Sequence, residues 1–169
     1  MSAVSAFMLS LLARQQQLLG GRFFEHHPSD WLVWEPGPSR PSRILTSNSD
    51  STLNPSGGSP QQPVDADPLC FELKRAPRAT LTVGRATEND LVLNDLTVSR
   101  EQFVLQLIDQ AWQVRGRGSP VTVDGAMVGE AGSPLRNGAV ITAGNARLTF
   151  YSPEGFPQRL EQESLKRHR

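Results

Sequence analysis

The stretch Val83–Gln102, which reads VGRATENDLVLNDLTVSREQ, decides the fold of the chain. It begins at the end of the apolar run 81–83 and stops immediately before a second apolar run, 103–108. Gly84 lets the chain turn after the first run without a Cβ clash. An arginine directly after such a turn lies at a loop rim rather than in a core, and Arg85 occupies that position.

A hydroxyl and a second guanidinium stand at the start of the other apolar run, as Ser99 and Arg100. If the two runs are paired strands, Arg85, Ser99 and Arg100 converge at one end of a sheet. Two arginines and a serine form a suitable cradle for a doubly charged phosphate. The alternative from spacing alone is an ordinary β-hairpin region with solvated arginines.

Several residues of this stretch resemble, in order and spacing, the core of a forkhead-associated (FHA) domain. That family typically shows Gly-Arg, then Asn-Asp-Ile/Leu, then Ser-Arg-x-His. The resemblance covers residues 69–156, and it implies a β-sandwich whose loops at one end recognise phosphothreonine. The residues that carry it are Gly84-Arg85, Asn89-Asp90-Leu91-Val92-Leu93, Asp95 and Val98-Ser99-Arg100.

The resemblance also implies roles for individual side chains. Arg85 and Ser99 match the residues that contact the phosphate, and Arg100 lies where a second phosphate- or backbone-contacting residue is often found. Gln102 replaces the family histidine, which braces the loop, and an amide can take over part of that bracing. Ser119 replaces the asparagine that holds the peptide backbone. Because one hydroxyl cannot donate and accept at two separated points, phosphate capture is better supported than backbone recognition.

Short apolar segments separated by turn signals follow residue 69, which predicts an all-β sandwich independently of the resemblance. Asp124-Gly125 between two short apolar segments is a strong signal for a two-residue hairpin. The predicted strands are 69–73, 80–83, 91–93, 103–108, 112–115, 121–123, 127–128, 140–142 and 147–151.

Before this module, residues 1–35 predict a short amphipathic helix followed by an aromatic segment. Apolar residues recur at helical spacing and Gly20-Gly21 stops the pattern. A signal peptide is the competing interpretation, but no basic region or cleavage site accompanies the apolar run. Residues 31–34, Trp-Leu-Val-Trp, are either a short strand or an apolar clip beside the helix.

Residues 36–68 are rich in Pro, Ser, Gly and Asn, so we expect a disordered, flexible linker. Its Thr46 and Thr52 are candidate phosphorylation sites that the module itself could bind, and the alternative is a linker whose hydroxyls only keep it soluble. We expect a fragment that starts near Asp67 to fold without the preceding residues. Residues 157–169 predict a helical tail.

Composition narrows the functional classes. Seventeen Lys and Arg balance seventeen Asp and Glu, so the chain lacks the basic footprint of a nucleic-acid binder. One cysteine, Cys70, and three histidines make a structural zinc site improbable, and we expect no metal and no cofactor. A single cysteine is compatible with a reducing, cytoplasmic location. The N-terminal apolar run is too short to span a membrane.

The sequence therefore predicts a non-catalytic, phosphothreonine-dependent protein-binding module of a signal transduction pathway. Its site residues are Arg85, Ser99, Arg100 and Ser119, and its partner is a phosphothreonine-containing protein, a substrate of a Ser/Thr kinase. No catalytic base, nucleophile or phosphate-binding Gly-rich loop suggests an enzyme. The alternative is a scaffolding FHA-like domain that binds without phosphate, which the departures Gln102 and Ser119 favour.

Overall fold

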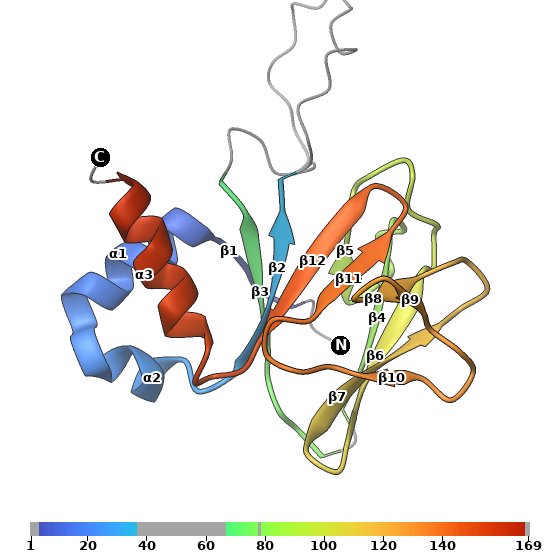
Figure 1. Cartoon of the computed structure of the whole chain (residues 1–169), viewed down its shortest axis with the longest axis horizontal. Coiled ribbons are helices and arrows are strands. Elements are labelled where there is room, and N and C mark those ends of the chain that lie inside the picture. The colour runs from blue at the N-terminus through green and yellow to red at the C-terminus, as the bar shows by residue number, and fades with distance from the viewer. Residues whose placement is uncertain (1–3, 37–66, 78, 168–169) are drawn as a thin grey trace, which may run out of the picture.

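Two β-sheets pack face to face and a layer of helices covers the outer face of one of them (Figure 1). The computed structural model describes residues 4–36, 67–77 and 79–167. The predicted all-β, FHA-like sandwich with an N-terminal helix is confirmed.

The first sheet has seven strands, and all of its neighbouring strands are antiparallel. In spatial order they are β1 (Ala6–Met8), β3 (Leu69–Leu73), β2 (Asp30–Glu35), β12 (Ala146–Tyr151), β11 (Val140–Ala143), β8 (Thr122–Val123) and β9 (Ala126–Met127).

The second sheet has five strands, and β4 and β5 form its parallel pair. In spatial order they are β10 (Ser133–Pro134), β7 (Ala111–Gly116), β6 (Phe103–Ile108), β4 (Thr80–Gly84) and β5 (Leu91–Val92). Predicted strands 69–73 and 103–108 agree with β3 and β6 at both ends. The sequence missed β1 and β10, which are two or three residues long.

The main core lies between the two sheets. Because successive side chains of a strand alternate between faces, β6 sends Phe103 and Leu105 inward, and β12 sends Leu148 and Phe150 to meet them. Trp112 of β7 is 1% exposed in the same cluster. Each apolar side chain buried in this way contributes about 1.5–3 kcal/mol relative to an exposed one, so this cluster supplies much of the driving force for folding.

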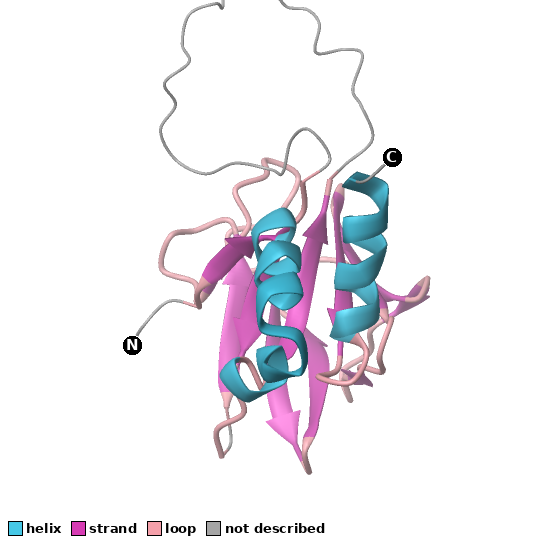
Figure 2. Ribbon diagram, turned by 90° about the vertical axis from the view of Figure 1, so that its left-hand side faces the viewer, coloured by secondary structure: helices cyan, strands magenta, loops and turns pink. Residues whose placement is uncertain are grey.

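A second apolar cluster joins the helices to the outer face of the seven-stranded sheet. Figure 2 shows the helices lying against this sheet. The helices are α1 (Leu9–Leu19), the 3-10 turn η1 (Gly20–Arg22), α2 (Phe23–His26) and α3 (Phe156–Arg167). Trp31 of β2 stacks on Phe156 of α3, with ring centroids 4.7 Å apart. The cluster also contains Leu9 and Leu12 of α1.

The predicted N-terminal helix begins only at Leu9. Residues 6–8 pair with β3, and the Glu72 amide donates to the Ser5 carbonyl, so these residues are extended rather than helical. The helix ends where Gly20 adopts a positive φ of 58°, which agrees with the predicted stop.

The N-terminal residues are part of the sheet, which corrects the expected separation between residues 1–35 and the sandwich 69–156. β2 lies between β3 and β12, with Trp34 opposite both Leu69 and Leu148. Residues 36–68 therefore connect two neighbouring antiparallel strands rather than two separate units. Thr46, Thr52 and most of this predicted linker lie outside the described residues.

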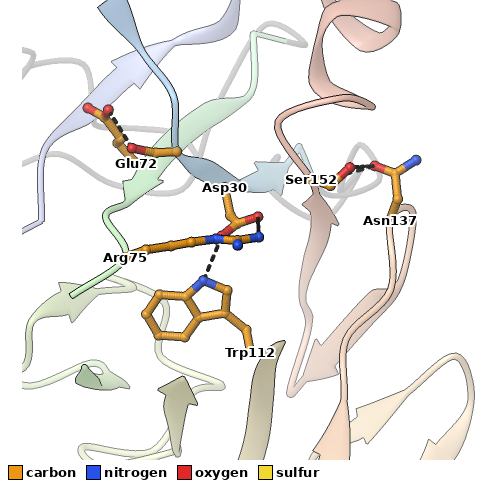
Figure 3. A network of polar contacts seen from close by, with 7 residues as sticks. Asp30, Glu72, Arg75, Trp112, Asn137 and Ser152 are labelled. Carbon is orange, nitrogen blue, oxygen red and sulfur yellow. Dashed lines mark hydrogen bonds and ion pairs between the residues drawn. The ribbon is translucent and has the colours of Figure 1, made fainter. Parts of the chain in front are cut away.

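A buried carboxylate ties the two sheets together near the start of β2 (Figure 3). Asp30 is 0% exposed and accepts hydrogen bonds from Arg75 Nε at 2.7 Å and Arg75 Nη2 at 3.1 Å. Trp112 Nε1 of the five-stranded sheet donates to the same carboxylate at 2.9 Å. A buried charge needs such partners, and this one links β2 of the seven-stranded sheet to β7 of the five-stranded sheet.

A second polar contact in Figure 3 fixes the turn before α3. The Ser152 hydroxyl donates to Asn137 Oδ1 at 3.5 Å, which is the contact drawn in Figure 3. The Ser152 amide donates to the same oxygen at 3.0 Å, and the Ser152 carbonyl accepts from Phe156 N at 3.0 Å. Arg159 of α3 donates to Glu35 Oε1 at 2.9 Å. These contacts hold α3 against the sheet.

Candidate functional site

The loop after β4 lies directly against the segment before β6. Arg85 N donates to the Ser99 carbonyl at 2.9 Å, and Ala86 N donates to the Arg100 carbonyl at 3.2 Å. Gly84 permits this approach, because a Cβ at this position would overlap the Arg100 carbonyl oxygen. The structure therefore brings together the two ends of the stretch 83–102.

The Arg85 side chain is held by its Nε, which donates to the Val98 carbonyl at 3.0 Å. The residue is half-buried. Among the described residues the Nη atoms of its guanidinium have no protein acceptor, so the two-pronged end of the group stays available to a ligand. A guanidinium oriented in this way presents a planar fork that matches phosphate geometry.

The Ser99 hydroxyl contacts the hydroxyl of Ser119, which comes from the loop between β7 and β8. Both residues are half-buried. A hydroxyl can donate one hydrogen bond and accept two, so this pair keeps the capacity to bind a further group. The structure thus places Arg85, Ser99 and Ser119 at one end of the sandwich.

Gln102 holds the loops of this site with a single amide. It is 2% exposed. Its Oε1 accepts from Ser99 N at 2.7 Å and its Nε2 donates to the Pro120 carbonyl at 2.9 Å. The amide therefore holds the backbone of Ser99 and that of Pro120, which follows Ser119. This is the bracing expected of it from the sequence.

Asn89 is a second internal brace, and the sequence analysis gave it no role. It is 6% exposed, and its Nδ2 donates to the carbonyls of Ala86 at 2.8 Å and Arg100 at 2.6 Å. An asparagine in a short loop between two strands is the sequence feature that could have predicted hydrogen bonds from its side chain to nearby backbone groups. Asn89 thereby fixes the backbone at Ala86, next to Arg85, and at Arg100 in the facing segment.

Asp95 and Thr97 connect the site to the other sheet. Asp95 Oδ1 accepts from Thr97 N at 2.8 Å and from Thr97 Oγ1 at 2.6 Å. Thr97 Oγ1 in turn accepts from Asn145 N at 2.8 Å, in the turn between β11 and β12. This network anchors the segment that leads to Ser99.

Arg100 differs from the other predicted site residues because its side chain is exposed. Its carbonyl is fixed by Asn89, whereas its guanidinium has no partner among the described residues. Arg100 lines a hollow of about 550 Å³ together with Thr82 and the carboxylates of Glu88 and Glu101. The structure therefore places Arg100 beside the site rather than in its centre.

Within the described ranges no group of three His, Cys, Asp or Glu residues is arranged to hold a metal ion. The loops of the site supply hydrogen-bond donors: one guanidinium fork and two hydroxyls. Such donors can bind an anion.

Comparison with protein families identifies the fold. Residues 71–154 match the family model described as the inner membrane component of the type III secretion system, cytoplasmic domain, which is an FHA-type domain. The chain is an FHA domain protein. This match begins within β3 and ends before α3. It therefore leaves out the N-terminal strands β1 and β2 and all of the helices.

Solved FHA domains resemble this one over part or most of its length. The FHA domain of CT664 from Chlamydia trachomatis is 18% identical over 73% of this chain and 98% of that chain, with a TM-score of 0.48. An FHA domain from Arabidopsis thaliana is 17% identical over 73% and 85%, with a TM-score of 0.48. The N-terminal FHA domain of Rad53p from S. cerevisiae, solved with a phosphothreonine peptide, is 21% identical over 47% and 73%, with a TM-score of 0.42.

A comparison with curated protein sequences gave no match. In the part of the chain that the structure describes, none of the helices is long and apolar enough to cross a membrane.

Proposed function

We propose that this FHA domain is a phosphothreonine-dependent protein-binding module without catalytic activity. The observation that carries the proposal is the convergence of the Arg85 guanidinium with the Ser99 and Ser119 hydroxyls at one loop end. The partner is a protein phosphorylated on threonine by a Ser/Thr kinase, and the module acts in signal transduction.

The donors suit a phosphate in charge and in geometry. A phosphothreonine carries about −1.5 to −2 charges and three strong acceptor oxygens. The free Nη atoms of Arg85 supply charge-assisted hydrogen bonds, and the two hydroxyls supply neutral ones. A phosphate oxygen can replace the mutual hydroxyl contact of Ser99 and Ser119, because each hydroxyl then donates to the ligand instead.

Preorganisation favours binding at this end of the sandwich. Gln102 and Asn89 are both buried and together hydrogen-bond the backbone of four loop positions. Because these loops are already fixed, little conformational entropy is lost when the phosphate binds. Arg100, at the rim, adds positive charge that steers an anionic ligand toward the site.

The proposal includes a cytoplasmic location. A single buried cysteine, Cys70, is compatible with a reducing compartment. The matching family model is described as a cytoplasmic domain, which supports the same location.

A peptide library tests the function. The full chain is immobilised and exposed to a library with a fixed central phosphothreonine and, in parallel, to the same library with unphosphorylated threonine. We expect retention of the phosphorylated library only. Equal retention of both libraries would contradict the proposal and would favour the phosphorylation-independent scaffold. Retention of neither library would also contradict the proposal.

A further inference from the structure

A groove of about 810 Å³ crosses the outer face of the five-stranded sheet. Its floor consists of outward-facing side chains from three adjacent strands, with Thr82 of β4 opposite Val104 of β6 and Val104 opposite Arg115 of β7. One wall is the loop before β8, and residues 127–130 form another part of the lining. The neighbouring side chains in these strands point into the core, so the groove belongs to the outer surface.

The groove is continuous with the candidate site. Ser119 lines the groove, and its hydroxyl contacts Ser99. A peptide whose phosphate lies at Ser99 therefore needs no further opening to continue along the sheet. An extended chain advances about 3.3 Å per residue, so only a few residues would reach from the site into the groove.

The charges of the groove favour an acidic ligand. Arg115 is exposed and has no carboxylate within ion-pairing distance among the described residues. Arg117 has only a weak, exposed contact with Glu101 at 3.4 Å, which contributes little. Glu130 is the single carboxylate of the lining, so two guanidinium groups outweigh it.

The groove also offers an apolar contact. The Met127 side chain is 65% exposed in the lining. An apolar side chain of a bound peptide can cover part of this exposed surface.

We propose that this groove binds the residues that flank the phosphothreonine of the partner. The flanking segment is extended, and it carries an acidic side chain opposite Arg115 and an apolar side chain against Met127. This inference rests on the proposed function, because it starts from a phosphate at Ser99. It identifies the ligand as an acidic phosphothreonine peptide.

Three fluorescent peptide pools test the inference. Each has a central phosphothreonine. The short pool has two alanines on each side, the acidic pool has six flanking positions per side drawn from Asp, Glu, Leu and Ala, and the basic pool has Lys and Arg instead of the acids. Fluorescence anisotropy at fixed ionic strength measures the affinities. We expect the affinity for the acidic pool to be at least about fivefold higher than that for the short pool, because one exposed ion pair with some added contact contributes on this scale.

Variants of Arg115 assign the effect to the groove. Arg115→Ala should abolish the advantage of the acidic pool and leave the affinity for the short pool unchanged. Arg115→Glu should transfer the advantage to the basic pool. Arg147→Ala is the matched control, because Arg147 is an exposed strand arginine of the other sheet and should change nothing. Thermal unfolding checks that each variant is folded.

A nuclear magnetic resonance measurement locates the peptide directly. In protein with 13C-labelled methionine methyl groups, the Met127 signal, assigned by Met127→Leu, should shift with the acidic pool and not with the short pool. Met8, on β1 of the other sheet, is an internal reference that should not shift. If all three pools bind equally and Met127 does not shift, the groove inference is wrong and the proposed function stands. If no phosphorylated pool binds, both are wrong.

Discussion

Gln102 shows how one buried side chain can position several donors of a site. Its amide accepts from Ser99 N and donates to the Pro120 carbonyl, so it fixes the backbone beside both hydroxyls. A carboxamide has both a donor and an acceptor, which a hydroxyl or an alkyl side chain cannot provide at this separation. The site depends on this residue although Gln102 contacts no ligand itself.

We predict that Gln102→Ala lowers the free energy of unfolding by about 1–3 kcal/mol, because two polar groups lose their partner. It should also weaken phosphopeptide binding, since the Ser99 and Ser119 loops are no longer held together. Chemical denaturation and fluorescence anisotropy measure the two effects. Gln113→Ala is the control, because Gln113 is a half-buried glutamine whose side chain makes no hydrogen bond within the described residues. Equal behaviour of the two variants would contradict the bracing role.

Cys70 gives the chain a pH dependence on the alkaline side. Burial raises the pKa of its thiol well above the ordinary value, and the nearby Arg159 only partly opposes this. The folded state therefore keeps the thiol protonated at a pH where the unfolded chain loses the proton. Stability is fully present below the unfolded pKa of about 8.5 and falls above it, by up to about 1.4 kcal/mol per pH unit.

Cys70→Ala should flatten this decline between about pH 8.5 and 10, whatever its effect on stability at neutral pH. Denaturant unfolding at a series of pH values measures the slope. Equal slopes for the parent and the variant would show that Cys70 does not cause the decline.

The sequence predicted individual site residues better than it predicted their contacts. The positions of Arg85 and Ser99 at strand ends follow from local patterns, and the bracing by Gln102 follows from the chemistry of its amide. The contact between Ser99 and Ser119 depends on how two loops twenty residues apart meet, which is a tertiary property. Composition and spacing do not contain that information.

At the scale of elements, β2 shows why the sequence left residues 31–34 as either a short strand or an apolar clip. Leu32 and Trp34 pack into the core between the sheets, while Trp31 and Val33 pack under the helices. A strand buried on both faces reads as a continuous apolar run, which cannot be distinguished from a short buried clip by periodicity. The two-residue strands such as β10 carry too few residues for any pattern.

The turn after β4 is an element whose geometry requires glycine. We predict that Gly84→Ala lowers the free energy of unfolding by about 1–3 kcal/mol, since the new methyl group overlaps the Arg100 carbonyl and forces the loops apart. Denaturant unfolding measures the loss. Gly129→Ala is the control because its Cβ would meet open space. If both variants are as stable as the parent, the close approach at Gly84 is not required.

At the scale of the whole molecule, the N-terminal strands complete the sheet. β3 pairs only with β1 and β2 among the described strands, so removing residues 1–36 leaves β3 without a neighbour. It also exposes the core side chains Phe71 and Leu148, which β2 covers. The sequence-based expectation that a fragment starting near Asp67 folds by itself conflicts with this topology.

We predict that residues 67–169 alone give no cooperative thermal transition, and that co-expression with residues 1–36 restores one because β2 can insert between β3 and β12. Replacement of residues 38–65 by a short turn should preserve cooperative unfolding, since Trp34 and Leu69 are already opposite each other. Differential scanning calorimetry measures these transitions. A transition of the 67–169 fragment equal to that of the full chain would contradict the role of β2.

The most direct test of the account is titration calorimetry with a phosphothreonine peptide from the library selection, at fixed ionic strength, on the parent and on Arg85→Ala. Because charge-assisted bonds contribute roughly 1.5–3 kcal/mol each, we predict a loss of about 2–4 kcal/mol, or about 30- to 1000-fold in affinity, for Arg85→Ala. Arg85→Lys should recover only part of the loss, Ser99→Ala should lose about 1 kcal/mol, and Arg147→Ala should bind as the parent does. If Arg85→Ala binds as tightly as the parent, or the parent binds the unphosphorylated peptide equally well, phosphate recognition by this site is wrong.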